Sequence, residues 1–209
     1  MPDIKPESGL AGVSRHLDLG CGNRPRNPYG RDVLHGLDIA PGPGSLSTGA
    51  TVVRANVALE PIPFSADTFD SVSAYDFLEH VPRVLPTADG QTLRFPFVEL
   101  MNEIWRVLKP DGLLYASTPC YPHPAVFQDP THVNPFTHAT HEYFTRPNLI
   151  AQMYGFRGDF EAVRVVSSQP RHDYEPLRMG LREKLSQWNR RRKGPESHVV
   201  WEFRAMKSA

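Results

Sequence analysis

The stretch His16–Pro28, HLDLGCGNRPRNP, places an apolar run directly before a loop with two glycines. Such a junction is typical of the first strand of a parallel sheet, whose carboxyl end opens onto a ligand site. Gly20 and Gly22 allow the backbone to adopt positive φ and to approach a ligand closely. Arginines and prolines, among them Pro25, stand where a phosphate-binding helix would begin. The stretch therefore favours a ligand that needs the glycine loop but no phosphate-binding helix.

Short apolar runs alternate with helical or turn-rich segments along the rest of the chain. The expected strands are GVSRHLDLG (12–20), VLHGLDIA (33–40), TVVRAN (51–56), FDSVSAYD (69–76), GLLYAST (112–118), FEAVRVVSS (160–168) and SHVVWEFRAM (197–206). Strands that alternate with crossovers predict a parallel sheet covered on both faces. The last two strands are separated by a helical segment, LRMGLREKLSQWNRRR, and this order predicts an antiparallel hairpin at one edge.

Two further helices are expected between the strands. Apolar residues recur every three or four positions in FPFVELMNEIWRVLKPDG (95–112), and Pro110 with Gly112 supplies the stop. This pattern predicts a helix that faces the core and leads into the fifth strand. A second helix is expected from Pro147, with Thr145 near its cap, to about Gly155.

Composition restricts the class of protein. The 209 residues are 40% hydrophobic and 22% charged, which fits one compact domain spanning 1–209. Lysine plus arginine (23) equals aspartate plus glutamate (23), so no overall field attracts nucleic acid or an anionic membrane. Two widely separated cysteines indicate a reducing compartment. No apolar run approaches the ~20 residues of a membrane span and the start lacks the apolar centre of a signal peptide, so we expect a cytoplasmic protein.

The glycine loop and a later carboxylate together indicate an adenosine compound. Asp38, at the end of LHGLDI, can accept hydrogen bonds from both ribose hydroxyls. A dinucleotide would also need a helix N-terminus to neutralise its pyrophosphate, and Pro25 stands in that place. S-adenosylmethionine carries no phosphate. It therefore suits this loop better than NAD does, and a nicotinamide oxidoreductase is disfavoured.

The motifs resemble those of the class I S-adenosylmethionine-dependent methyltransferases, within them the small type-11-like group associated with bacterial polysaccharides and the cell envelope. LDLGCGN (17–23) and GLDIAPG (36–42) are similar to the first two family motifs, and 55–81 and 101–119 to those that follow. The resemblance covers about residues 14–150. It implies an α/β, Rossmann-like seven-stranded sheet of order 3-2-1-4-5-7-6, with strand 7 antiparallel and helices on both faces.

The resemblance also implies roles for individual residues. Asp18 and the loop Gly20, Cys21 and Gly22 correspond to contacts with the methionyl end, directly or by shaping the loop. Asp38 and Ile39 correspond to the ribose site, Asn56 and Val57 to the adenine site, and Tyr75 to the neighbourhood of the sulfonium. Asp18 and Asp38 have a purely local alternative, because short acids at strand ends often bond backbone amides of their own turn.

A Pro- and His-rich connection, 119–147, follows the fifth strand and covers the mouth of the active site in this fold. It contains His123, Asp129, His132, His138 and His141, and four histidines with an aspartate could ligate zinc. No compact ligand motif is present, so we expect no metal ion and keep a zinc site in this connection as the alternative. Its DPTHVNPFT (129–137) is similar to a segment found in the cell-envelope-associated enzymes.

Methyl transfer to a hydroxyl needs a base, and our candidates, in order, are His132, His80 and Asp76. Glu79 and His80 alternatively form a structural pair in which the carboxylate orients the imidazole.

These features predict an S-adenosylmethionine-dependent methyltransferase with a small-molecule or glycan-type acceptor, most simply at oxygen. Nucleic acid is disfavoured as acceptor, because AYDFLEH (74–80) lacks the Asn/Asp-Pro-Pro-aromatic signature of base methylation. The alternative is a non-catalytic module that binds S-adenosylmethionine or S-adenosylhomocysteine. The late basic helix is either a solvated amphipathic edge helix or a contact for an anionic acceptor, a lipid-linked glycan or a membrane surface. The sequence leaves the oligomeric state open.

Overall fold

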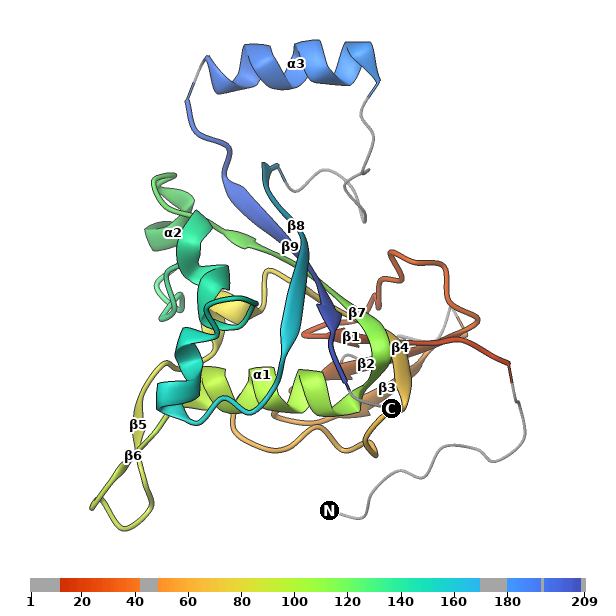
Figure 1. The fold of residues 1–209 in the computed structure, drawn as a ribbon, viewed down its shortest axis with the longest axis vertical. Coiled ribbons are helices and arrows are strands. Elements are labelled where there is room, and N and C mark those ends of the chain that lie inside the picture. The colour runs from red at the N-terminus through yellow and green to blue at the C-terminus, as the bar shows by residue number, and fades with distance from the viewer. Residues whose placement is uncertain (1–11, 42–48, 170–179, 193, 208–209) are drawn as a thin grey trace.

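The structure is a computed structural model of the 209-residue chain, and it describes residues 12–41, 49–169, 180–192 and 194–207. Seven strands form one sheet of order β3-β2-β1-β4-β7-β9-β8 (Figure 1). They are β1 (Arg15–Leu19), β2 (Val33–Asp38), β3 (Thr51–Arg54), β4 (Phe69–Tyr75), β7 (Leu108–Pro119), β8 (Phe160–Ser168) and β9 (His198–Ala205).

Parallel pairing runs from β3 through β2, β1 and β4 to β7, whereas β9 pairs antiparallel with both β7 and β8. The predicted order 3-2-1-4-5-7-6 with an antiparallel strand 7 is therefore confirmed, β9 being that strand. Because β9 is antiparallel, its first residues lie at the edge where β4 and β7 end. In register, His198 lies opposite Pro119.

The remaining elements lie in the connections. They are η2 (Leu78–His80), the short hairpin strands β5 (Leu85–Pro86) and β6 (Leu93–Arg94), α1 (Pro96–Val107), α2 (Ala125–Gln128), η3 (His138–Tyr143), η4 (Ile150–Tyr154) and α3 (Leu181–Arg191). The helix expected over 147–155 is shorter, a 3-10 turn that ends at Gly155 in the left-handed conformation. The hairpin β5–β6 was not predicted, since its strands are only two residues long.

Helix α1 forms the core on one face of the sheet, as its spacing predicts. Its Leu100, Met101 and Ile104 are buried. The ring of Phe97 meets Phe136 and Phe144 edge to face, at centroid distances of 5.5 and 5.2 Å. These contacts join the Pro- and His-rich connection to α1, so the core holds that connection in place at the edge of the sheet.

The opposite face is covered differently. Tyr75, Tyr115 and Val200 are buried there, and Tyr29 from the first crossover packs on them. No helix forms in the fully described crossover between β1 and β2, because it is short and rich in proline. Within the described segments, a loop therefore covers this face where the fold usually has a helix.

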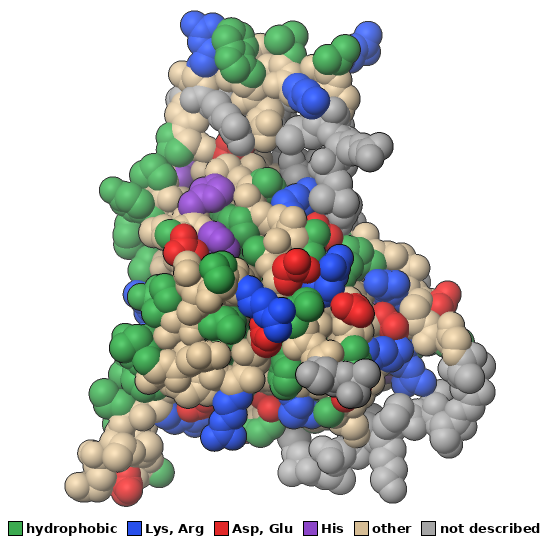
Figure 2. Space-filling model, in the orientation of Figure 1, with side chains coloured by type: hydrophobic (Ala, Val, Ile, Leu, Met, Phe, Trp, Pro, Cys, Tyr) green, Lys and Arg blue, Asp and Glu red, His purple; other side chains and the backbone are tan. Residues whose placement is uncertain are grey.

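Helix α3 stands apart from the sheet (Figure 1). Its apolar stripe does not pack on the core, since Leu181, Leu185 and Trp188 are 87%, 62% and 55% exposed. Green and blue side chains alternate along this helix at the top of Figure 2. Leu177, Arg178 and Lys193 of the predicted stripe and basic cluster lie outside the described residues.

Candidate functional site

The glycine loop after β1 takes the conformation that its sequence requires. Gly20 and Gly22 have φ of +64° and +55°, and the amide of Gly20 donates to Leu37 O at 2.8 Å. A Cβ added to Gly20 would lie 2.5 Å from Cδ2 of Phe77. Gly20 is therefore required both for its backbone conformation and for its contact with the segment after β4.

Asp18 shapes this loop from within. Its side chain is buried, Oδ1 accepts from Ser73 Oγ at 2.6 Å, and Oδ2 accepts from the amide of Arg26 at 2.8 Å. Ser73 also bonds His16 Nε2 at 2.8 Å. The structure thus contains the local alternative for Asp18, in which its carboxylate bonds a backbone amide of its own loop. The same carboxylate also connects the loop to the core of the sheet.

Asp38 performs a similar task at the end of β2. Oδ2 accepts from the amide of Gly22 at 2.8 Å and Oδ1 from the amide of Ala40 at 2.9 Å. Each carboxylate oxygen keeps a second lone pair, and the residue is partly exposed. A role toward ribose hydroxyls is compatible with these bonds and remains a prediction.

A cavity of about 640 Å³ opens beside this loop, within the ~300–1,000 Å³ usual for ligand sites. Arg26 places its guanidinium over the ring of Tyr75, 4.4 Å from the centroid. The lining includes Asp18, Gly20, Cys21, Asn23, Arg26 and Tyr75. Burial, followed by the charges of Asp18 and Asp38, raises the pKa of the Cys21 thiol to about 12. Cys21 is therefore a lining residue without nucleophilic character.

Other predicted cofactor residues lie outside the lining of this cavity. Ile39 is 57% exposed, and its carbonyl accepts from Arg54 Nε at 3.0 Å. The carbonyl of Asn56 accepts from the amides of Leu59 and Glu60, at 3.0 and 2.9 Å, and begins a turn. Val57 is buried and borders a different cavity.

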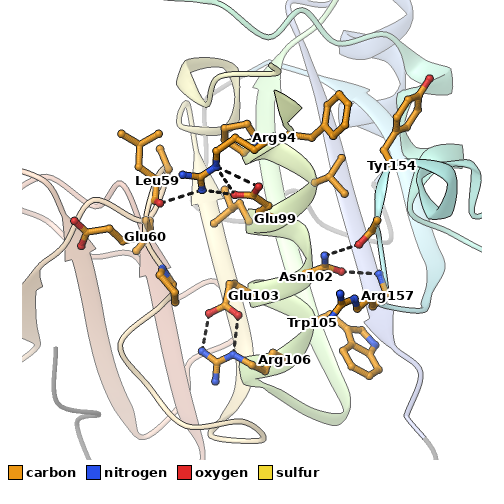
Figure 3. A pocket seen from close by; sticks show the side chains of 18 of the residues that line it. Leu59, Glu60, Arg94, Glu99, Asn102, Glu103, Trp105, Arg106, Tyr154 and Arg157 are labelled. Carbon is orange, nitrogen blue, oxygen red and sulfur yellow. Dashed lines mark hydrogen bonds and ion pairs between the residues drawn. The ribbon is translucent and has the colours of Figure 1, made fainter. Parts of the chain in front are cut away.

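That second cavity, about 720 Å³, lies along α1 and is lined by Val57, Arg94, Asn102 and Tyr154 among others (Figure 3). Four of its charged side chains form two ion pairs, Arg94 with Glu99 and Arg106 with Glu103. The first pair joins β6 to α1, and Arg106 also donates to the carbonyls of Phe64 and Ile62, so we regard this cavity as a structural groove.

Asp76 directly follows β4, and its side chain contacts His198, the first residue of β9. His198 Nε2 lies 2.8 Å from Asp76 Oδ1, and His198 Nδ1 lies 2.8 Å from Ser197 Oγ. The His198 side chain is 9% exposed and that of Asp76 is 50% exposed. Asp76 adopts φ of +47°, a left-handed conformation that non-glycine residues seldom adopt and that clusters at functional sites. The pair presents a carboxylate to the surface at the strand edge.

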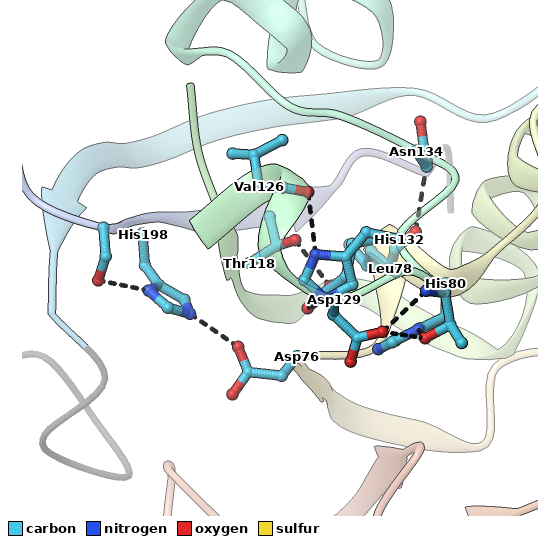
Figure 4. A network of polar contacts seen from close by, with 12 residues as sticks. Asp76, Leu78, His80, Thr118, Val126, Asp129, His132, Asn134 and His198 are labelled. Carbon is cyan, nitrogen blue, oxygen red and sulfur yellow. Dashed lines mark hydrogen bonds and ion pairs between the residues drawn. The ribbon is translucent and has the colours of Figure 1, made fainter. Parts of the chain in front are cut away.

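A second polar cluster lies next to this pair (Figure 4). Glu79 Oε2 accepts from Thr118 Oγ1 at 2.8 Å, and Oε1 lies 3.9 Å from His132 Nε2. The rings of His80 and His132 meet edge to face at 4.9 Å. Burial, with a smaller contribution from the charge of Asp76, raises the pKa of Glu79. Glu79 thus faces His132, not only the adjacent His80.

The predicted base candidates His132, His80 and Asp76 are brought together, whereas the other histidines of the connection are not. His138 Nε2 bonds Ser167 Oγ at 2.6 Å, His141 Nδ1 bonds the His138 carbonyl at 2.6 Å, and His123 Nδ1 accepts from the Ala125 amide at 3.2 Å. These three rings satisfy local backbone and side-chain groups.

Sequence reasoning missed His198 and the partner of Glu79. His198 had a signal, because it begins the one strand expected to run antiparallel, and such a strand starts where its parallel neighbours end. The Glu79–His132 contact spans a proline-rich connection, and no spacing rule predicts which histidine of that connection turns inward.

Comparison with known proteins agrees with this fold. A sequence profile of the family described as "Methyltransferase domain" matches residues 4–162. A solved S-adenosylmethionine-dependent methyltransferase from Mesorhizobium loti is 18% identical, with a TM-score of 0.51 and 93% of each chain covered. No curated protein matches in sequence.

Two further solved structures share the fold. A putative methyltransferase from Haloferax volcanii, solved with the Trm112 methyltransferase activator, is 16% identical, with a TM-score of 0.55 and coverage of 93% of this chain and 84% of that one. A putative sarcosine dimethylglycine methyltransferase from Galdieria sulphuraria is 17% identical, with a TM-score of 0.53 and coverage of 94% and 79%.

The seven-stranded sheet with its glycine loop defines a class I methyltransferase fold, and the matched profile extends over most of the chain. The chain belongs to the methyltransferase-domain family, and its structural neighbour from Mesorhizobium loti is described as S-adenosylmethionine-dependent. Among the described helices none is both long and apolar enough to cross a membrane.

Proposed function

We propose that this methyltransferase acts on an oxygen atom of a small-molecule or glycan-type acceptor. The observation that carries the proposal is the Asp76–His198 pair at the strand edge, 2.8 Å between Oδ1 and Nε2, with a half-exposed carboxylate. A hydroxyl group keeps its proton at neutral pH, so its methylation needs a nearby base. Asp76 is the predicted candidate whose acceptor atoms are most open to a ligand.

The chemistry assigns a role to each member of the pair. When bound, the cofactor supplies a methyl group on a sulfonium. Transfer would form the bond between the acceptor oxygen and the methyl carbon as the sulfur–carbon bond breaks, and the Asp76 carboxylate would take the hydroxyl proton. His198, fixed by Ser197 on its other nitrogen, holds that carboxylate in place and shares the proton. No net charge is then left on the acceptor.

His132, our first candidate from sequence, is less suited to be the base. Its Nδ1 is bonded to the carbonyl of Val126 at 3.0 Å, its Nε2 faces Glu79, and its side chain is only 10% exposed. The proposal therefore places Asp76 first and assigns His132 and His80 to the adjoining cluster.

The class of acceptor is proposed from the surroundings of the site. The Pro- and His-rich connection borders the Asp76–His198 pair, so the shape of that connection selects the acceptor. Helix α3 combines exposed Leu185 and Trp188 with the exposed cations Arg182 and Lys184. This combination fits peripheral contact with an anionic membrane and an acceptor such as a lipid-linked glycan.

Incubation of metabolite and cell-envelope fractions with methyl-labelled S-adenosylmethionine tests the proposal. We expect label in a base-stable ether linkage, and Asp76→Asn should reduce transfer by about 10²–10⁴-fold without weakening binding of S-adenosylhomocysteine. Asp89→Asn, in the exposed hairpin, is the matched control. Binding without transfer to any fraction would instead identify a non-catalytic module, and label on nitrogen would refute oxygen as the acceptor atom.

A further inference from the structure

Three side chains from two distant parts of the chain converge beside the Asp76–His198 pair. Glu79, His80 and His132 each present one ligand atom, and these atoms all lie within 4.8 Å of one another. Glu79 and His80 belong to η2, directly after β4, and His132 comes from the connection after β7 (Figure 4). Two imidazoles and one carboxylate form a ligand set suited to divalent transition metals.

The carboxylate of Glu79 is oriented but incompletely satisfied. The residue is 2% exposed, and Thr118 Oγ1 donates to Oε2 at 2.8 Å. Oε1 is buried and accepts no hydrogen bond from any residue that the structure describes. A buried acceptor normally has a partner, so this oxygen indicates a ligand or ion on the side of His132.

Hydrogen bonds fix the imidazole of His132 in the state that binds metals. Its Nδ1 lies 3.0 Å from the carbonyl oxygen of Val126, which can only accept, so Nδ1 carries the hydrogen. Nε2 therefore has a free lone pair, and it points toward Glu79 Oε1.

A relay orients His80 in the same way. Thr131 Oγ1 donates to Asp129 Oδ1 at 2.6 Å and lies 3.0 Å from His80 Nδ1. Because the threonine hydrogen is used by Asp129, Nδ1 of His80 is the donor to Thr131, and its Nε2 is left as an acceptor. Carboxylates and carbonyls behind ligating histidines are the usual second layer of metal sites.

We propose that Glu79 Oε1, His80 Nε2 and His132 Nε2 bind a divalent transition-metal cation. Tetrahedral bonds of about 2.1 Å place ligand atoms about 3.4 Å apart. Oε1 and His132 Nε2 are separated by 3.9 Å, so a small side-chain rotation completes that part of the site. A hydrogen bond between Glu79 Oε1 and His132 Nε2 does not explain the arrangement, because their separation of 3.9 Å is too long for one.

The site deepens the proposed function and, for its role, rests on it. Three protein ligands leave coordination positions open, and the cluster adjoins Asp76. An acceptor hydroxyl bound at an open position would lose its proton more readily to the Asp76–His198 pair. The cation would therefore hold and acidify the acceptor oxygen and would take no part in binding the cofactor.

Titration of the full chain with Co²⁺ after chelator treatment tests the site. We expect one equivalent to bind, with visible d–d absorption typical of nitrogen and oxygen ligands. Glu79→Gln and His132→Ala should each weaken binding at least about 100-fold, and Asp129→Asn by roughly tenfold through His80. His138→Ala, in the same connection, should bind Co²⁺ like the unaltered protein.

Binding of S-adenosylhomocysteine to each variant shows that the fold is intact and separates this proposal from the proposed function. Absence of Co²⁺ binding, or equal binding by Glu79→Gln, would overturn the metal site even if methyl transfer to oxygen is observed. Loss of binding in His138→Ala to the same extent would do so as well. Specific Co²⁺ binding without any methyl transfer would support the site and refute the oxygen-transfer role.

Discussion

The buried histidine at the base of the glycine loop should make the fold sensitive to acid. His16 in β1 is fully buried, with Nδ1 2.8 Å from Ser71 Oγ and Nε2 2.8 Å from Ser73 Oγ. Burial, reinforced by the positive charge of Arg31, lowers its pKa to about 3. Since Ser73 also bonds Asp18, protonation of His16 would disturb the network that holds the glycine loop.

The sign of the effect follows from proton uptake. Between pH 6.5 and 3 the histidine of the unfolded chain is protonated and the folded one is not, so acid favours unfolding. The free energy of unfolding should fall by about 1.4 kcal/mol per pH unit in this range. The contribution lost is about 2 kcal/mol at pH 5 and roughly 4 kcal/mol at pH 3, and it reaches its full value of about 5 kcal/mol only below pH 3.

His16→Gln removes the titrating group and keeps a side chain that can bond a serine hydroxyl. Urea unfolding followed by tryptophan fluorescence at pH 7, 6 and 5 gives the free energy of unfolding for both proteins. The variant should be less stable at pH 7, but the difference should shrink by about 2 kcal/mol at pH 5. His138→Gln, at an exposed ring, should leave the slope unchanged. Parallel pH dependences for His16→Gln and the unaltered protein would show that His16 does not cause the acid sensitivity.

Three further predictions concern the loop, the thiols and α3. Gly20→Ala forces a Cβ against Phe77 at positive φ, so we expect a loss of about 1–3 kcal/mol in stability and at least tenfold weaker binding of S-adenosylhomocysteine by calorimetry. Burial raises the pKa of Cys21 to about 12 and that of Cys120 to about 11, so a thiol reagent at pH 8 should modify neither within minutes unless the protein is denatured. Vesicles containing anionic lipid should shift the fluorescence of Trp188 and should sediment the protein in low salt. A variant with both Trp188→Ser and Leu185→Ser should stay in solution. Equal sedimentation of that variant would show that α3 is a solvated helix only.

Much of the sheet could be predicted because its signals are local. The strands of 69–76 and 160–168, and the helix ending before Pro110, follow from apolar periodicity and stop residues. The antiparallel edge followed from the order of elements. The two-residue strands of the β5–β6 hairpin carry no such periodicity, and the 3-10 turn near Gly155 depends on packing.

The site was predictable where backbone chemistry determines it. Gly20 and Asp18 lie where the motif places them, since a turn at positive φ and a short acid are local requirements. Long-range partners were not predictable. Asp76 bonds His198 across 122 positions of sequence. Glu79 meets His132 because aromatic packing holds the connection and the amides of Val133 and Asn134 both donate to the Glu79 carbonyl at 2.9 Å.

Cofactor binding distinguishes a methyltransferase from a nicotinamide-dependent enzyme in this protein. Calorimetric titration with S-adenosylhomocysteine, the demethylated form of the sulfonium cofactor, and separately with NAD compares a phosphate-free adenosine ligand with a dinucleotide in the same glycine loop. The loop lacks a phosphate-binding helix, so we predict one equivalent of S-adenosylhomocysteine bound and no heat with NAD. Tighter binding of NAD, or no binding of S-adenosylhomocysteine by the folded protein, would contradict the account.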